Sequence, residues 1–157
     1  MKRINLGDLE FERYEARPEG YKAGIASFGK SIGATMLGAT VYELPPGQSV
    51  GPYHYEYGNE EWALVLQGRP TLRRPNGDEP VEPLDVICFP VGPEGAHNFT
   101  NQTDETVRVL LLSTMVDPAL AVYPDSDKIG VFPGDEHHGD HVMVRRESHV
   151  DYYDRET

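Results

Sequence analysis

The chain has 157 residues and a formal net charge of −12, because 26 acidic residues outnumber 14 basic ones. A negative field of this size repels phosphate backbones and anionic lipid, which argues against nucleic acid and membrane surfaces as partners. The sequence lacks both a run of about eighteen apolar residues and a secretory signal pattern. We therefore expect one cytoplasmic domain over residues 1–157.

Prolines and glycines are spread through the chain and divide its apolar residues into short runs, which favours strands over long helices. Asn76 and Gly77 suit the positive φ angles of a tight hairpin. The expected strands, in chain order, cover residues 35–44, 53–56, 61–67, 70–74, 85–89, 96–100, 106–115 and 141–146.

Short strands separated by turns predict an all-β fold, an antiparallel sandwich or barrel. We expect the barrel core at about residues 32–116, an N-terminal arm over 1–31 and a C-terminal extension over 117–157. Arms and edge strands often pack on a neighbouring subunit, so the chain is expected to form a homodimer.

Cys88 is the single cysteine, which excludes an internal disulfide and a zinc site built on several thiolates. It lies in the apolar run "DVICFP". This setting predicts a buried and unreactive thiol.

The stretch "HYEYGNEEW", residues 54–62, combines one imidazole with three carboxylates. Alternate side chains of a strand share a face, so His54 and Glu56 are expected on one face. If residues 53–67 fold as a hairpin, Glu61 meets them, while Glu60 points to the opposite, solvated side. Buried carboxylates are costly unless a cation or protons compensate them, so a divalent metal ion is the expected partner.

A further ligand is expected from His97, which follows the tight loop "PVGPEG". Imidazole and carboxylate ligands suit iron(II), manganese, nickel or zinc. Two histidines with one carboxylate also leave coordination positions free for a substrate.

The order Gly47, His54, Glu56, Glu61 and Gly68 resembles the first sequence motif of the cupin family. Six residues instead of five follow the first glycine, and Glu56 stands in place of the second histidine of the motif. This second departure changes the expected surroundings of the metal ion.

Residues 84–101 resemble the second cupin motif. Pro90, Gly92 and Asn101 match it, Leu84 replaces its first glycine, and His97 follows after four residues instead of two. The resemblance implies a jelly-roll-like barrel, the antiparallel double-stranded β-helix.

The resemblance also implies one bound divalent ion (Zn, Mn, Fe or Ni) with His54, Glu61 and His97 as ligands. Glu56 is then a fourth ligand, a general base or a bystander. Glu56 and Glu61 are the candidate catalytic groups for proton transfer. Asn101 is interpreted as a turn former.

Two functions remain open. The first is a metal-dependent enzyme of dioxygenase, isomerase or decarboxylase type that acts on a small polar metabolite. The second is a barrel that binds a sugar or another small molecule without turnover, which the replacement at Glu56 favours. Tyrosines near the site and few cations suggest a neutral or chelating ligand, although Arg69, Arg73 and Arg74 leave room for a carboxylate.

Three other patterns are interpreted as chance matches. "GIASFGKS" at 24–31 fits a phosphate-binding loop, but the residues after it do not favour a helix. "DSDKIGVFPGDE" at 125–136 resembles a calcium loop without flanking helices. "DEHHGDH" at 135–141 is typical of an acidic surface loop more than of a metal site.

Overall fold

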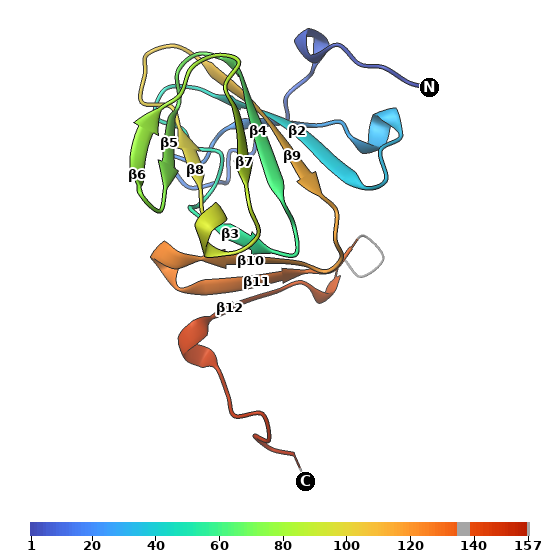
Figure 1. Ribbon diagram of the computed structural model, residues 1–157, viewed down its shortest axis with the longest axis vertical. Helices are drawn as coiled ribbons and strands as arrows, with labels where there is room; N and C mark the ends of the chain where they lie inside the picture. The colour runs from blue at the N-terminus through green and yellow to red at the C-terminus, as the bar shows by residue number, and fades with distance from the viewer. Residues whose placement is uncertain (135–138, 157) are drawn as a thin grey trace.

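The computed structural model describes residues 1–134 and 139–156, and its strands form three antiparallel sheets (Figure 1). Helix within these residues is limited to short 3-10 turns. None of the described helices is long and apolar enough to span a membrane. The predicted all-β fold is therefore confirmed.

The largest sheet has five strands in the order β1-β2-β9-β4-β7. It crosses the upper part of the molecule in Figure 1. Its strands are Gly24–Ser27, Leu37–Leu44, Val107–Thr114, Glu61–Gln67 and Val86–Phe89.

A second sheet has the order β12-β11-β10-β3 and lies below the first in Figure 1. Its strands are Val142–Arg145, Lys128–Phe132, Ala119–Tyr123 and Tyr55–Tyr57. The third sheet, β6-β5-β8, consists of Gly77–Pro80, Thr71–Arg74 and Asn98–Thr100. Each of the eight segments predicted from the sequence overlaps one of these strands.

Four strands were not predicted: β1, β6, β10 and β11. β6 is polar and lies at a sheet edge. Because solvent surrounds much of such a strand, its sequence does not show the alternation of apolar and polar residues by which a strand is recognised. β10 and β11 pair across the turn at Pro124–Ser126, so the C-terminal extension supplies three of the four strands in the second sheet.

The core is built from strand alternation in the five-stranded sheet. On its inner face, Ala63 and Val65 of β4 are buried with Val109 of β9. On its outer face, Leu64 and Leu110 pack against residues of the N-terminal segment. The N-terminal arm therefore covers one side of this sheet, with Leu6, Leu9, Phe11 and Phe28.

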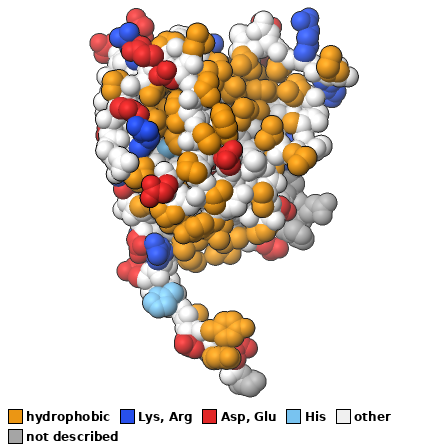
Figure 2. Space-filling model, viewed as in Figure 1, with side chains coloured by type: hydrophobic (Ala, Val, Ile, Leu, Met, Phe, Trp, Pro, Cys, Tyr) orange, Lys and Arg blue, Asp and Glu red, His pale blue; other side chains and the backbone are white. Residues whose placement is uncertain are grey.

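The predicted burial of Cys88 is wrong, because its side chain is exposed. In β7 the burial alternates, and Phe89 points into the core while Cys88 takes the opposite face. Trp62 lies beside Cys88 in the register and is 43% exposed. Figure 2 shows hydrophobic side chains gathered over the face that this sheet presents to the viewer.

The predicted hairpin over residues 53–67 is also wrong. β3 pairs with β10, whereas β4 pairs with β7 and β9 in another sheet. The turn at Gly58 and Asn59 thus carries the chain from one sheet to the other. His54 and Glu61 consequently face each other across the barrel and not along one ladder.

Candidate metal centre

Each of the three sheets contributes to one cluster of side chains. His54 lies one residue before β3, His97 one residue before β8, and Glu61 begins β4. The two histidines form an antiparallel bridge, in which each backbone N–H donates to the carbonyl of the other at 2.8 and 3.2 Å. Their rings lie 5.1 Å apart between centroids.

The orientation of both imidazoles is fixed by the backbone two residues upstream. Nδ1 of His97 lies 2.9 Å from the carbonyl oxygen of Gly95, and Nδ1 of His54 lies 3.0 Å from that of Pro52. A carbonyl only accepts, so each Nδ1 carries the proton and donates it. Each Nε2 is left with a free lone pair, the form that binds a metal ion.

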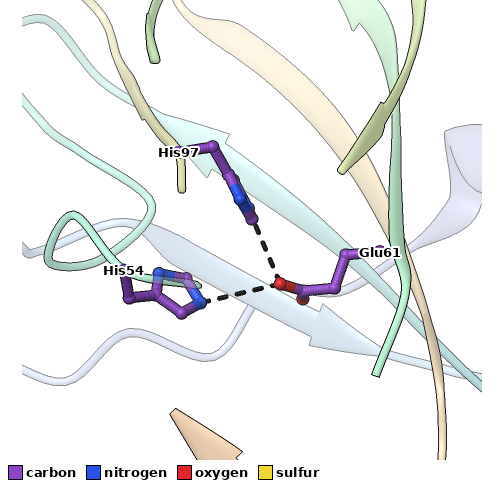
Figure 3. Close-up of side chains that lie close together, drawn as sticks. All are labelled: His54, Glu61 and His97. Atoms are coloured by element: carbon purple, nitrogen blue, oxygen red, sulfur yellow. Dashed lines mark ion pairs between the residues drawn. The ribbon is translucent and has the colours of Figure 1, made fainter. Parts of the chain in front are cut away.

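Both Nε2 atoms are directed at one carboxylate oxygen, as Figure 3 shows. Oε2 of Glu61 lies 3.7 Å from Nε2 of His54 and 3.8 Å from Nε2 of His97. The three ligand atoms lie within 4.8 Å of one another. An ion at about 2.0–2.2 Å from each atom bridges gaps of this order, whereas a hydrogen bond does not.

Burial makes the cluster neutral without an ion. His97 is 2% exposed and Glu61 12%. Burial and the nearby Glu56 raise the pKa of Glu61 to about 8. Burial and the neighbouring imidazole of His54 lower the pKa of His97 to about 4. Burial also lowers the pKa of His54. These shifts favour the neutral form of each group that the dashed lines in Figure 3 connect.

The residues present fit a divalent ion. Nε2 of His97 is a buried nitrogen without a hydrogen-bond partner in the described chain. A buried acceptor of this kind is costly unless a cation or water occupies the site. Phe89 stacks on the His97 ring at 3.7 Å between centroids, which holds the imidazole in place and excludes water from one side.

The structure brings three of the four predicted ligands together. The carboxylate of Glu56 lies outside this three-residue group. It accepts a hydrogen bond of 2.8 Å from Nδ2 of Asn59, which is 4% exposed. The Oδ1 of Asn59 in turn accepts from Thr114 and from the backbone N–H of Val116. Glu56 is therefore held in one orientation beside the cluster.

Glu56 and Glu61 both line a broad cleft of about 1070 Å³. Tyr42, Thr40 and Ser113 continue its wall along the inner face of the five-stranded sheet. The cleft gives a small molecule access to Glu61 of the three-residue group and to a second carboxylate, Glu56.

Glu60 and Asn101, for which the sequence predicts no role as metal ligands, form hydrogen bonds elsewhere in the fold. Glu60 accepts a hydrogen bond of 2.7 Å from the indole N–H of Trp62, on the outer side of the sheet. Asn101 is fully buried and donates to the carbonyls of Leu44 and Glu105. Asn101 therefore organises its turn, as the sequence predicts.

The other sequence patterns have structural explanations. In "GIASFGKS", strand β1 is followed by a three-residue 3-10 turn at Lys30–Ile32 and not by a longer helix. Asp125, in the calcium-like pattern, binds Arg73 through both carboxylate oxygens. Most of the "DEHHGDH" pattern lies outside the described residues.

The contributions of Asn59 and Tyr123 were not predicted. No role at the site was expected for Asn59, because its partner Thr114 in β9 is 55 positions away in the chain. The ring of Tyr123 stacks on His54 at 5.8 Å between centroids. Tyr123 lies in β10, a strand that the sequence analysis did not identify.

The fold and the cluster together define a β-barrel protein with a possible metal site between its sheets. Residues 40–113 match the family model of the cupin domain. This match and the similarity to solved cupin structures show that the chain has the cupin β-barrel fold. Among curated proteins, no sequence is significantly similar to this chain.

Several solved structures share this fold. A sugar phosphate isomerase from a cupin superfamily, from Silicibacter pomeroyi, is 22% identical over 98% of both chains, with a TM-score of 0.81. The polyketide cyclase RemF of Streptomyces resistomycificus is 26% identical over 73% of this chain and 79% of its own, with a TM-score of 0.60. A predicted oxalate decarboxylase of Thermotoga maritima is 19% identical over 73% and 100%, also with a TM-score of 0.60.

Proposed function

We propose that this cupin is a metal-dependent enzyme that binds one divalent ion through His54, Glu61 and His97. Its substrate is a small polar hydroxy-carbonyl compound that enters the broad cleft. The observation that carries the proposal is the buried Nε2 of His97, which has no hydrogen-bond partner among the described residues and is directed at Glu61. A cation at this point satisfies the nitrogen and compensates the carboxylate.

The donor set supports a borderline or hard ion such as zinc, manganese, iron(II) or nickel. When bound, such an ion supplies Lewis-acid polarisation of a substrate oxygen. Three protein ligands leave coordination positions for that oxygen. Phe89 and Tyr123 pack on the two imidazoles and keep them aligned with Glu61.

Glu56 is the proposed proton-transfer group. It lines the same cleft as Glu61, and Asn59 orients its carboxylate. In the isomerisation of a hydroxy-carbonyl compound, a base removes a proton from the hydroxyl-bearing carbon and returns it to the former carbonyl carbon, while the hydroxyl proton moves to the former carbonyl oxygen. No oxidant is consumed. The similarity over 98% of both chains to a protein named a sugar phosphate isomerase favours this reaction over the dioxygenase and decarboxylase alternatives.

Metal content tests the first part of this proposal. Untagged protein purified without chelator is expected to carry about one divalent ion per chain, and Glu61→Gln to lose it, because a structured site retains its ion. Glu60→Gln is the matched control, because the carboxylate of Glu60 lies next in sequence to Glu61 but accepts a hydrogen bond from Trp62 on the outer side of the sheet. Less than about a tenth of an ion per wild-type chain overturns the proposal.

The catalytic part is tested by solvent deuterium incorporation into a panel of aldose and ketose phosphates, followed by NMR. Glu56→Gln is expected to retain the ion and to lower exchange at least about a hundredfold, the usual contribution of a general base. Exchange at the wild-type rate in this variant excludes Glu56 as the base.

The second candidate function is a module that binds a small molecule without turnover. One observation favours it: an oxygen of Glu56 is already engaged by Asn59. Metal retention without deuterium exchange on any member of the panel supports this alternative.

A further inference from the structure

A second cavity of about 550 Å³ adjoins the broad cleft. Ser27 and Thr40, paired between β1 and β2, line the cleft, and the next inward-facing pair, Ile25 and Tyr42, lines the second cavity. Pairs two residues apart on one face are separated by about 7 Å. Tyr42 lines both cavities, so they follow each other along the inner face of one sheet.

Two half-buried cations line the second cavity, Arg17 and Lys128. Within the described part of the chain, neither forms an ion pair; the salt bridges there involve other cations, including Arg69, Arg73, Arg74 and Arg108. The arginines that the sequence analysis considered for a carboxylate ligand are thus all paired. Arg17 and Lys128 are instead the cations of this cavity that remain available to an anionic ligand.

Both cations lie against aromatic rings. The guanidinium carbon of Arg17 is 4.6 Å from the centre of the Tyr14 ring, and Nζ of Lys128 is 5.3 Å from that of Tyr123. Such contacts hold a cation in place and leave its hydrogen-bond donors available.

One carboxylate also lines this cavity, but its charge is compensated. Asp125 accepts hydrogen bonds of 2.6 and 2.9 Å from the guanidinium of Arg73. Arg17 and Lys128 therefore leave the cavity positive, in a chain whose net charge is −12. Unpaired cations in a concave site attract an anionic group.

Each cation lies one tyrosine away from the candidate metal centre. The Tyr123 ring that carries Lys128 stacks on His54. Tyr42 lines the broad cleft together with Glu61 and the second cavity together with Arg17. Burial raises the pKa of Tyr42, the charge of Glu61 raises it further, and Arg17 opposes the shift. The cationic cavity and the metal centre are thus adjacent parts of one barrel mouth.

We propose that Arg17 and Lys128 form an anion subsite that binds the phosphate monoester group of the substrate. A phosphate monoester carries a charge of about −1.5 to −2 at pH 7 and three acceptor oxygens, which two cations complement. Tyr53 and Ser126 line the same cavity, and each carries a hydroxyl group that is a neutral hydrogen-bond donor. The inference rests on the proposed function and adds the class of substrate, a phosphorylated hydroxy-carbonyl compound.

Calorimetric titration of the zinc-loaded protein with ribose 5-phosphate and with ribose tests this subsite. We expect the phosphorylated probe to bind at least about tenfold more tightly. Arg17→Gln and Lys128→Gln should each reduce that preference to about threefold or less without changing the affinity for ribose. Arg69→Gln, whose guanidinium pairs with Glu82 outside the cavity, is the control and should leave the preference unchanged.

Equal affinities for the two probes, or equal losses in the control, overturn the subsite. In the native protein, added NaCl should weaken ribose 5-phosphate binding and leave ribose binding unchanged. This measurement does not depend on the folding of any variant. Titration of metal-stripped protein with inorganic phosphate separates the two proposals. If phosphate binding to the stripped protein depends on Arg17 and Lys128, and the wild-type protein as purified carries less than about a tenth of an ion per chain, the subsite is supported and the metal-dependent function is overturned. Full metal occupancy without any phosphate binding does the reverse.

Discussion

The two segments that supply the histidines orient them in the same way but bury them differently. In both, a carbonyl two residues upstream accepts from Nδ1 and leaves Nε2 for an ion. His97 is 2% exposed and lies flat on Phe89, whereas His54 is 19% exposed and stacks on Tyr123 at the barrel mouth. The same Nδ1–carbonyl hydrogen bond thus orients both ligands, while the difference in burial decides how much stability the fold loses when each histidine is replaced.

The largest expected effect comes from replacing the buried ligand. His97→Ala should abolish metal retention and lower the free energy of unfolding of the metal-free protein by about 2–4 kcal/mol, because it leaves a cavity beside Phe89. His54→Ala should also abolish metal retention but cost only about 1 kcal/mol, since solvent reaches its site. Elemental analysis and urea unfolding in EDTA measure the two quantities.

His149→Ala is the control for these variants, because this histidine is exposed in the C-terminal segment. It should change neither metal content nor stability. Equal destabilisation by His97→Ala and His54→Ala would contradict the difference in burial.

The second effect is the pH dependence of the metal-free protein. The pKa of Glu61 is raised from 4.5 to about 8, so its contribution to stability is complete below pH 4.5 and is lost as pH rises through 8. The pKa of His97 is lowered from 6.5 to about 4, so its contribution is complete above pH 6.5 and is lost as pH falls through 4.

Between pH 6.5 and 8 only the Glu61 contribution changes, and the free energy of unfolding measured in EDTA should therefore fall. Glu61→Gln should remove this slope, whereas Glu60→Gln should keep it. A wild-type protein whose stability is flat across this range would show that the carboxyl of Glu61 is already ionised at pH 6.5.

The smallest effect concerns the turn before the second segment. Leu84 adopts a φ of 76° and is 78% exposed, at the place where the cupin motif has glycine. A left-handed conformation costs a non-glycine residue about 1–2 kcal/mol, and glycine avoids this cost. The unfolded chain gains entropy with glycine, which offsets about 0.5–1 kcal/mol of the gain in stability. Leu84→Gly should therefore stabilise the protein by up to about 1 kcal/mol in urea unfolding and leave metal content unchanged.

Gly68, at the end of the first cupin-like motif, is the matched comparison for Leu84, because its φ is also left-handed, at 75°. A Cβ at Gly68 would lie 2.7 Å from a methyl carbon of Val107. Gly68→Ala should therefore destabilise the protein. A loss of stability in Leu84→Gly would show that the leucine side chain makes contacts that outweigh its backbone strain.

The sequence alone determined the cupin resemblance, the all-β fold and the residues His54, Glu61 and His97. These follow from local signals: short apolar runs between turn residues, and ligand types at family spacings. The turn-forming role of Asn101 and the outward direction of Glu60 also follow from turn chemistry and strand parity.

Only the tertiary structure decided that His54 and Glu61 belong to different sheets, that Asn59 orients Glu56, and that Arg17 and Lys128 line one cavity. The physical reason is that alternation along a strand fixes which face a side chain takes but not which strand lies opposite. Asn59 and Thr114 are 55 positions apart, and Arg17 and Lys128 lie near opposite ends of the chain. Strand pairing across the whole barrel brings such residues together, and no local pattern records it.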